Sequence, residues 1–554
     1  MPPQTDAAEY PARAWLPVVA AGVLVTATFM FFSPDFGVTW DERARHGYGD
    51  RVLQFLQGDR PRTDFAPTST GGHLYAALFD VLGAFVHQTL GGDLWTIRHY
   101  LNALFGGIGV IASGLLAARL GGRPAGLLAI LLLACSPRYV AHSMNNPKDL
   151  PFAALCAVAL LSFTAVRPVV PFLTWRRAVI IGLAIALPLN VRPGALLYLG
   201  FLGVLLAFLT WRTRAWAPQQ VLWTAVLLAL ATAVALVGGT VFWPWAQANP
   251  LVRPFQALLE ASQYGWRGTV LFGGRDILVD AVPWSYVPLW MVITIPPVVL
   301  AGLGMAMVLL VRGRAPAWHA GLWAVACVPV LLVIIQRSTL YDGWRHMLFV
   351  YPPLVVLAAD AWRRLITSER PWSRWVSTAG LVVGLLEPAA FIIRNHPHQV
   401  VYFNAFVGGP RGALGRFELD YWGSSVRAAV AWTADLARAA GRPLCVAGSP
   451  GDLVRLHVRH QPALYWRRQA DRAHHLHVHL LRDSAASVHA LLARSDILHV
   501  VRMDDGAPIA VVVPGPGFSE VAGSLEPLLC RGGGQSPAMP ARLRGTAQER
   551  ERCR

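Results

Sequence analysis

The chain has 554 residues, of which 55% are hydrophobic and only 14% are charged, and its formal net charge at pH 7 is +17. This composition excludes an ordinary water-soluble domain, in which about a quarter of the residues are charged. The basic excess does not indicate nucleic-acid binding, because the arginines form short clusters between apolar segments rather than one extended patch. A membrane protein is therefore predicted.

Apolar segments recur from residue 14 to about residue 393, and a helix needs about 20 apolar residues to cross the hydrocarbon layer. About eleven membrane-spanning helices are predicted, over residues 14–32, 97–117, 124–141, 149–166, 177–190, 193–210, 221–243, 286–311, 318–335, 346–363 and 375–393. Segment 72–90 is also apolar, but it carries His73, Asp80 and His87 and could equally lie along the membrane interface.

The short loops at one end of these segments are rich in arginine and nearly free of acidic residues. Their arginines are Arg119, Arg123, Arg167, Arg176, Arg177, Arg212, Arg214, Arg312, Arg314, Arg363, Arg364, Arg370 and Arg374. By the positive-inside rule, these loops and the N-terminal tail (1–13) are predicted to be cytoplasmic. Arg13 before the first apolar run also resembles a signal peptide, but no small-x-small cleavage site follows, so a retained anchor is favoured.

Three regions follow the tail. The predicted transmembrane region covers residues 14–394, with a first extracytoplasmic loop at about 33–96, and an odd number of crossings places the rest of the chain outside. From residue 395 to 530, apolar runs shorten to strand length and alternate with helical stretches, which predicts a small α/β domain. The runs are 444–447, 497–501 and 509–513, and the helical stretches are 426–440 and 485–493. Residues 531–554 mix Gly, Pro, Gln and Arg without periodicity, which predicts a disordered tail.

The exported domain offers two minor chemical possibilities. Cys445 and Cys530 could form a disulfide in an oxidising compartment. His475, His477 and His479 alternate and would share one face of a strand. Metal binding there is conceivable, but no carboxylate set accompanies the histidines.

The first outside loop begins at Ser33 and contains the adjacent carboxylates Asp41 and Glu42. Adjacent carboxylates near a membrane surface raise each other's pKa, so one of them can act as a base or hold a metal. The simpler alternative is a solvated pair in a loop.

The second outside loop, residues 136–149, is unusually polar for a short connection between two apolar helices. It contains Arg138, His142, Asn145, Asn146, Lys148 and Asp149. Such cations and amides suit a phosphate at the interface, with Lys148, the only lysine of the chain, as a point charge and arginine as a bidentate clamp. Polarity of an ordinary loop, followed by a helix start at Pro147, is the alternative.

The last short outside loop brings further polar groups to the same face, namely Arg337, Tyr341, Asp342, Arg345 and His346. Arg345 and His346 open a helix that then becomes apolar. A snorkelling arginine and a structural, hydrogen-bonded histidine would explain this pair equally well.

Five ordered motifs carry a family resemblance. They are Thr39-Trp-Asp-Glu42, the stretch from His142 to Asp149 that ends Asn-Asn-Pro-Lys-Asp, Tyr341-Asp-Gly-Trp-Arg-His346, Tyr402-Phe-Asn-Ala-Phe-Val-Gly-Gly-Pro410 and Phe417-Glu-Leu-Asp-Tyr-Trp-Gly423. With them, the chain resembles bacterial GT-C glycosyltransferases, and more narrowly family 39, which contains dolichyl-phosphate-mannose protein mannosyltransferases and lipid A aminoarabinose transferases. The likeness covers most of residues 14–440. The chain lacks an obvious long inserted β-trefoil domain, which argues against a protein acceptor, and the acceptor could be a glycan, a lipid or a protein.

The resemblance implies a mainly α, polytopic, GT-C-like enzyme of the inner or plasma membrane, with a small C-terminal α/β domain outside. Its partners would be a polyprenyl-phosphate sugar donor, an acceptor nucleophile on the outer side and the lipid bilayer. The hypothesis is inverting, direct displacement with Asp41 as general base. Glu42 would orient Asp41, bind acceptor or hold a divalent cation such as Mg or Mn.

The other motif residues divide into two groups under this hypothesis. Those expected to bind the donor phosphate are Lys148, Arg138, Arg345 and His346. Those expected to contact the acceptor or the donor sugar are Asn145, Asn146, Asp149, Tyr341 and Asp342. A transporter or flippase of lipid-linked sugars is the alternative from another class, although the sequence has no visible repeat and its charges lie in loops rather than within spans. A noncatalytic envelope assembly protein would not need Asp41.

Overall fold

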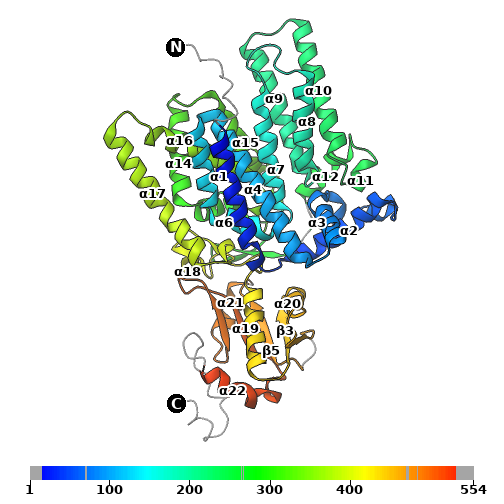
Figure 1. Ribbon diagram of the computed structural model, residues 1–554, viewed down its shortest axis with the longest axis vertical. Helices are drawn as coiled ribbons and strands as arrows, with labels where there is room; N and C mark the ends of the chain where they lie inside the picture. The colour runs from blue at the N-terminus through cyan, green and yellow to red at the C-terminus, as the bar shows by residue number, and fades with distance from the viewer. Residues whose placement is uncertain are drawn as a thin grey trace.

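The computed structural model describes residues 15–68, 71–263, 265, 267–469, 473–482 and 484–531. Figure 1 shows a helical part above a smaller part that is built around a sheet. The predicted N-terminal tail and residues 532–554 of the predicted C-terminal tail lie outside the described residues. Arg531 is the last residue of a helix.

The first half of the helical part is a bundle around α4. It contains α1 (Leu16–Phe32), α2 (Trp40–Gln57), α3 (Leu78–Leu90), α4 (Leu94–Gly121), α5 (Arg123–Ala134), α6 (Pro137–Asn145), α7 (Asp149–Ser162), α8 (Trp175–Leu189), α9 (Leu196–Arg212) and α10 (Pro218–Gly238). Helix α4 packs against α1, α5, α6 and α7. Glycines 106, 107 and 109 on α4 permit this approach, because a Cβ at any of them would lie 2.5 Å or less from a neighbouring side chain.

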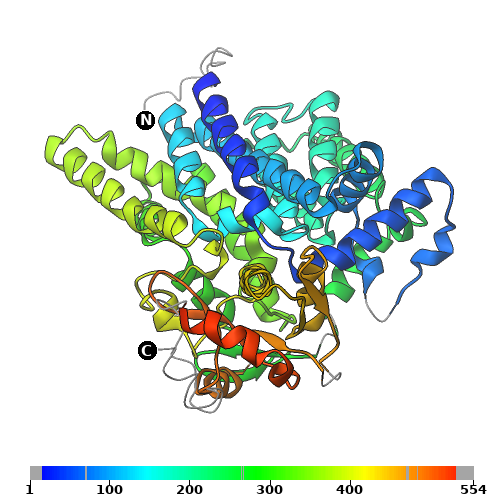
Figure 2. The same ribbon diagram turned by 60° about the horizontal axis from the view of Figure 1, so that its bottom comes forward.

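The second half of the helical part wraps around this bundle. It contains α11 (Pro244–Gln247), α12 (Arg253–Ser262), the hairpin β1 (Thr269–Phe272) and β2 (Arg275–Leu278), α13 (Tyr286–Thr294), α14 (Pro297–Val311), α15 (Ala317–Ile335), the 3₁₀ segment η7 (Arg345–Val350), α16 (Tyr351–Ile366), α17 (Pro371–Arg394) and α18 (Gly409–Ala413). Helix α16 packs against α4, α5 and α14, whereas α17 lies at the edge of the bundle in Figure 1 and Figure 2.

The protein is a multi-pass membrane protein by the length and composition of its helices, but the predicted count of eleven spans is not confirmed. Among the described residues, six helical segments are long and apolar enough to cross a membrane: Leu16–Asp35, Leu94–Gly121, Pro193–Arg212, Pro218–Gly238, Ala317–Ile335 and Pro371–Arg394. Two further segments qualify only as bent pairs, α5 with α6 at 72° and α13 with α14 at 118°. Pro137 and Pro297 open the second helix of each pair, where a residue without an N–H cannot continue the preceding helix.

Three of the predicted spans correspond to helices of 14 to 16 residues. Helices α7 and α16 have 14 and 16 residues, and nearly all of their side chains are buried among other helices. Helix α8 has 15 residues. Apolar runs of this length are typical of core helices as well as of membrane spans, so the number of crossings stays a prediction.

The C-terminal part is a mixed five-stranded sheet with helices packed on it. Its elements are α19 (Val426–Ala439), β3 (Leu444–Ser449), α20 (Gly451–Val458), β4 (Leu464–Trp466), β5 (Leu476–Leu480), α21 (Ala485–Leu492), β6 (His499–Arg502), β7 (Pro508–Pro514) and α22 (Ala522–Arg531). The strand order is β4-β3-β5-β7-β6, with β3 parallel to β4 and β5, and β7 antiparallel to β5 and β6. The expected strands and helices of a small α/β region are confirmed.

Two segments that the sequence presents as loops are helical. Residues 40–57 form α2, and residues 137–145 form α6, whose side chains are all buried. Polar density misled the prediction for α6, because its polar groups bond to neighbouring protein instead of water.

Candidate functional site

The start of α2 sends its two adjacent carboxylates in different directions. Glu42 is 1% exposed and turns back on the helix start, where its Oε2 accepts hydrogen bonds from the backbone N–H of Thr39 at 2.7 Å and from its hydroxyl at 3.1 Å. This reciprocal cap satisfies donors that a helix start would leave open. His99 Nε2 lies 3.1 Å from the other carboxylate oxygen. Glu42 therefore sits in a supporting position behind Asp41.

Asp41 instead faces two cations. Lys148 Nζ lies 3.1 Å from Asp41 Oδ2, and an Arg345 Nη atom lies 3.5 Å from the same oxygen. Burial raises the pKa of Asp41, but the charges of Lys148 and Arg345 outweigh it and lower this pKa to about 2. The expectation that the adjacent pair raises its own pKa is thus wrong for Asp41, because Glu42 points elsewhere.

Asp41 is the accessible end of a buried ionic cluster. Its side chain is 26% exposed, whereas the side chains of Lys148, Asp149, Arg192 and Arg345 are 10% exposed or less. Asp149 accepts hydrogen bonds from Arg345 at 2.8 Å, and its other oxygen lies 2.8 Å from Arg192. A ligand that reaches Asp41 therefore meets Lys148 and Arg345 directly behind it.

The loop before η7 extends the cluster toward the C-terminal part. Asp342 has a φ of +57°, a left-handed conformation that few residues other than glycine adopt, and its carboxylate accepts a hydrogen bond from Arg345 Nε at 3.0 Å. Arg345 also lies over the rings of Tyr341 and Trp422. His346 is half-buried, with its ring edge-on to Tyr341. The motif thus fixes Arg345 from several sides.

The amides before Lys148 act on the backbone around the cluster. The side chain of Asn145 donates to the carbonyl of Gly37, and its carbonyl accepts from the Thr39 hydroxyl. Asn146 accepts the backbone N–H of Lys148 and of Asp149 through its side-chain oxygen and donates to the Asp149 carboxylate. Both asparagines hold the cation-bearing segment in place.

Arg138 and His142 lie in a separate aromatic pocket. Arg138 donates to the carbonyl of Tyr402 and to the hydroxyl of Tyr421, and its guanidinium lies over three aromatic rings, those of Trp290, Phe403 and Tyr421. His142 Nε2 lies 3.2 Å from the same Tyr421 hydroxyl. Among the described residues, no carboxylate forms an ion pair with Arg138. The structure does not bring it into contact with Asp41.

Three residues of the cluster were not singled out from the sequence. Arg192 lies in a very short connection between two apolar segments, and its partner Asp149 is distant in the chain. Glu418 is 3% exposed, and Arg482 Nε lies 3.6 Å from its carboxylate. Glu418 belongs to the Phe417–Gly423 motif, but it carries no spacing signal of its own. Arg482 belongs to the C-terminal part and had no signal.

The donor set does not fit a divalent cation. No group of three or more His, Cys, Asp or Glu side chains within the described ranges has the arrangement of a metal site. Two cations already neutralise Asp41, and Glu42 is engaged by Thr39 and His99. The predicted Cys445–Cys530 disulfide stays a prediction, because the Cys530 side chain lies outside the described part.

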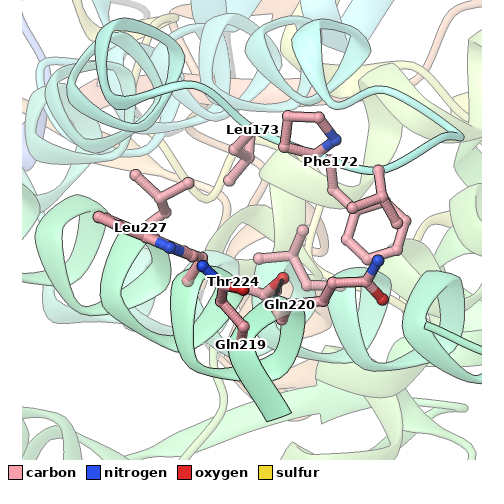
Figure 3. Close-up of a pocket in the computed structure, with 10 residues that line it drawn as sticks. Phe172, Leu173, Gln219, Gln220, Thr224 and Leu227 are labelled. Carbon is pink, nitrogen blue, oxygen red and sulfur yellow. Dashed lines mark hydrogen bonds between the residues drawn. The ribbon is translucent and has the colours of Figure 1, made fainter. Parts of the chain in front are cut away.

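Two of the cavities among the described residues are not lined by Asp41, Lys148 or Arg345. Figure 3 shows one of about 170 Å³, lined mainly by apolar side chains of the 170–173 segment, α9 and α10, and it contains no charged residue. The other, of about 500 Å³, lies where the β2–α13 loop meets the end of α15, and Asp280, Trp284, Arg337 and Leu340 are among its lining residues. Leu340 directly precedes the Tyr341 motif, so this larger cavity adjoins the site along the chain.

No family model matches the sequence, and no curated protein matches it. Among solved structures, the chain is similar to ArnT from Cupriavidus metallidurans in the apo state, at 18% identity over 91% of this chain and 98% of that one, with a TM-score of 0.47. It is also similar to the archaeal oligosaccharyltransferase AglB from Archaeoglobus fulgidus in complex with an inhibitory peptide and a dolichol-phosphate, at 12% identity over 76% of this chain and 58% of that one, with a TM-score of 0.44. A third similar structure is the S. cerevisiae protein O-mannosyltransferase Pmt1-Pmt2 complex bound to the sugar donor, at 17% identity over 44% of this chain and 34% of that one, with a TM-score of 0.34. All three TM-scores are below 0.5, so membership of family 39 stays a prediction.

Proposed function

We propose that the protein transfers a sugar from a polyprenyl-phosphate donor to an acceptor nucleophile on the extracytoplasmic side of the membrane. One observation carries the proposal: Asp41 is the accessible carboxylate of a buried cluster and is paired with Lys148 and Arg345. The two cations suit a phosphate, and the carboxylate beside them suits the proton of an attacking hydroxyl. The positive charges that a phosphate requires and the carboxylate that a base requires thus lie next to each other, at a position that a ligand can reach.

Binding of the donor changes the state of Asp41. A phosphate competes with Asp41 for the N–H groups of Lys148 and Arg345, so both cations share their charge with the ligand. The pKa of Asp41 then rises from about 2, because burial still disfavours the carboxylate while the opposing cations are partly engaged elsewhere. A carboxylate that is a very weak base in the free protein becomes a stronger base once the donor is bound.

The transfer is a single displacement. The acceptor oxygen attacks the anomeric carbon and gives its proton to an Asp41 oxygen, while the bond from that carbon to the phosphate oxygen breaks and its electron pair stays on the phosphate. The configuration at the anomeric carbon is inverted. Lys148 and Arg345 stabilise the negative charge that develops on the lipid phosphate, so no strong general acid is needed.

The remaining motif residues have supporting roles in this proposal. Asp149, Asn145 and Asn146 hold Lys148 and Arg345, and Glu42 orients Asp41 through the helix start. Tyr341, Asp342 and His346 shape the wall on the Arg345 side, where the sugar or the acceptor is expected to bind. Arg138 would receive the phosphate only if the aromatic residues around it rearrange. The acceptor nucleophile belongs to a glycan, a lipid or a protein.

The proposed orientation places Asp41 outside the cell. The α9–α10 turn, which carries Arg212 and Arg214, lies at the upper end of Figure 1, and the sheet lies at the opposite end. Arginine-rich turns favour the cytoplasmic side of a bacterial inner or other plasma membrane. This orientation supports a cytoplasmic N-terminus, with residues 395–530 as an extracytoplasmic domain and the transmembrane region ending near residue 394.

The test compares sugar transfer by wild type, Asp41→Asn and Asp50→Asn in membrane vesicles at matched expression, with a panel of labelled polyprenyl-phosphate sugars. Asp50 lies on the same helix and contacts Gln54, so its variant controls for general effects on α2. Loss of transfer in Asp41→Asn alone would support both the reaction and the base. Equal transfer by all three proteins would remove Asp41 from the mechanism.

A transporter of lipid-linked sugars is the second candidate, and the two bent helix pairs favour it. Broken helices at membrane depth are common at the substrate sites of transporters, and α6 carries Arg138 and His142 next to such a bend. Protein-dependent movement of lipid-linked sugar across the bilayer, with no transfer from any donor in the panel, would favour this function over glycosyl transfer.

A further inference from the structure

One arginine of the C-terminal part reaches the reaction centre. Arg482 follows β5 by two residues, beyond the carboxyl end of a strand that is central in the sheet. Carboxyl ends of parallel strands are common positions for functional side chains in α/β folds. The Arg482 side chain is 20% exposed and leaves its own sheet to contact the helical part.

Arg482 holds the loop that positions Arg345. An Nη atom of Arg482 donates to Asp342 Oδ1 at 2.5 Å, while the other oxygen of the same carboxylate accepts from Arg345. Asp342 thus bridges two guanidinium groups. The second guanidinium is the one that contacts both Asp41 and Asp149.

Arg482 also reaches the residue next to Asp41. Its guanidinium lies 5.4 Å from the centre of the Trp40 ring. It donates to the carbonyl of Tyr421 at 3.1 Å, and the same oxygen accepts the indole N–H of Trp40 at 3.0 Å. The Arg482 guanidinium therefore contacts both Trp40, which directly precedes Asp41, and Asp342, which lies three residues before Arg345.

We infer that Arg482 is a positioning residue of the transfer reaction, through which the C-terminal part completes the reaction centre by holding Asp342 and Trp40 in place. The inference rests on the proposed function, because it gives Arg482 a task only where Arg345 serves a leaving phosphate. It assigns the C-terminal part a role in the chemical step, beyond any role in binding acceptor.

Charge balance explains why loss of Arg482 would act on Arg345. Arg345 is shared among Asp41, Asp149 and Asp342. Without Arg482, Asp342 loses its second partner, and Arg345 is the nearby cation that can compensate. Arg345 then shifts toward Asp342 and away from the phosphate position. A planar guanidinium can bind a carboxylate, a carbonyl and a ring face at once, which an ammonium cannot do equally well.

The experiment measures kcat and donor KM of transfer for wild type, Arg482→Gln, Arg482→Lys and the control Arg494→Gln, with thermal unfolding of each protein. Arg494 lies in the same part of the chain, and its ion pair is with Asp496. We expect Arg482→Gln to lower kcat by about 100-fold, as a displacement near 1 Å at a reacting centre can do. Donor KM should change little, Arg482→Lys should recover part of kcat, and Arg494→Gln should match wild type.

A double variant distinguishes positioning from general destabilisation. Because Arg482 acts in part through Asp342, Arg482→Gln should lower kcat less in an Asp342→Asn background than in wild type. The inference would be overturned if the effects of the two substitutions on kcat simply multiplied in the double variant. It would also be overturned if the activity of Arg482→Gln fell only in proportion to the amount of folded protein. Wild-type kcat in Arg482→Gln would also overturn it and leave the proposed function intact. Absence of transfer by wild type with every donor would overturn both.

Discussion

Replacement of Glu418 by glutamine should make the protein more stable than wild type, and this difference in stability should grow as the pH rises. Burial raises the pKa of Glu418 from 4.5 to about 8, against a partial lowering by Arg482 and with a further increase from Asp342. One oxygen of this carboxyl group has no hydrogen-bond partner among the described residues. The folded protein therefore holds Glu418 as a neutral acid at neutral pH, and glutamine has nearly the same shape and the same charge.

The direction of this pH dependence follows from the protons that the folded and the unfolded protein bind. Between pH 4.5 and about 8, the unfolded chain has released the Glu418 proton while the folded protein still holds it, so rising pH favours the unfolded state. From about pH 5.5 to about pH 7.5, this linkage lowers the free energy of unfolding of wild type by about 2–3 kcal/mol relative to a side chain that does not titrate. Above the folded-state pKa the difference stops growing.

The measurement is unfolding in detergent, followed by tryptophan fluorescence, at a series of pH values for wild type, Glu418→Gln and Glu520→Gln. The Glu520 side chain is 66% exposed, so its variant should remain parallel to wild type. The difference in free energy of unfolding between Glu418→Gln and wild type should grow with pH. The transfer activity of Glu418→Gln at neutral pH should stay close to that of wild type. A constant difference, or a variant less stable than wild type at about pH 7.5, would show that Glu418 is ionised in the folded protein and refute the reasoning.

Three further variants and one control variant test the site and its support. Lys148→Gln removes one of the two cations that outweigh burial at Asp41, so the pKa of Asp41 should rise. The acid side of the pH–rate profile should then move to higher pH, and the rate of transfer should fall by about 100-fold. An acid side that stays at the same pH would contradict the pairing of Asp41 with Lys148. Gly49→Ala puts a methyl group 2.5 Å from Asp80 and should cost about 1–3 kcal/mol of unfolding free energy. The control on the open side of the same helix, Gly47→Ala, should instead gain about 0.5–1 kcal/mol, and equal thermal shifts would contradict the packing of α2 on α3. Asp80→Asn leaves two buried arginines without their carboxylate and should lower the unfolding free energy by about 3–5 kcal/mol, whereas unchanged unfolding would contradict that ion pair.

Periodicity predicted the C-terminal part well because its signals are local. The run at 509–513 lies within β7, and the helical stretch 426–440 matches α19 to within one residue. The order of the strands could not be predicted, because β3, β5 and β7 pair across long intervening segments. In the helical part, apolar length alone does not give the number of membrane crossings, because α7 is apolar but has only 14 residues.

The candidate site was predictable where its residues share short motifs and not where they meet through the fold. Asp41, Lys148 and Arg345 each lie in a distinct polar stretch, and the structure brings the three together. Arg192 and Arg482 reach the same cluster from segments without a polar pattern, so only their tertiary contacts identify them. The pKa of Asp41 was predicted with the wrong sign because sequence adjacency does not give side-chain direction.

The hydrogen bond from Trp40 to the Tyr421 carbonyl joins positions that are 381 residues apart. During synthesis, α2 leaves the ribosome long before its partner is translated. A nascent chain therefore exposes Asp41 without the neighbours that order it in the finished protein, and contacts between distant segments form last. A truncated or incompletely inserted chain consequently carries the carboxylate but lacks the assembled centre, which confines the protein's chemistry to fully synthesised molecules.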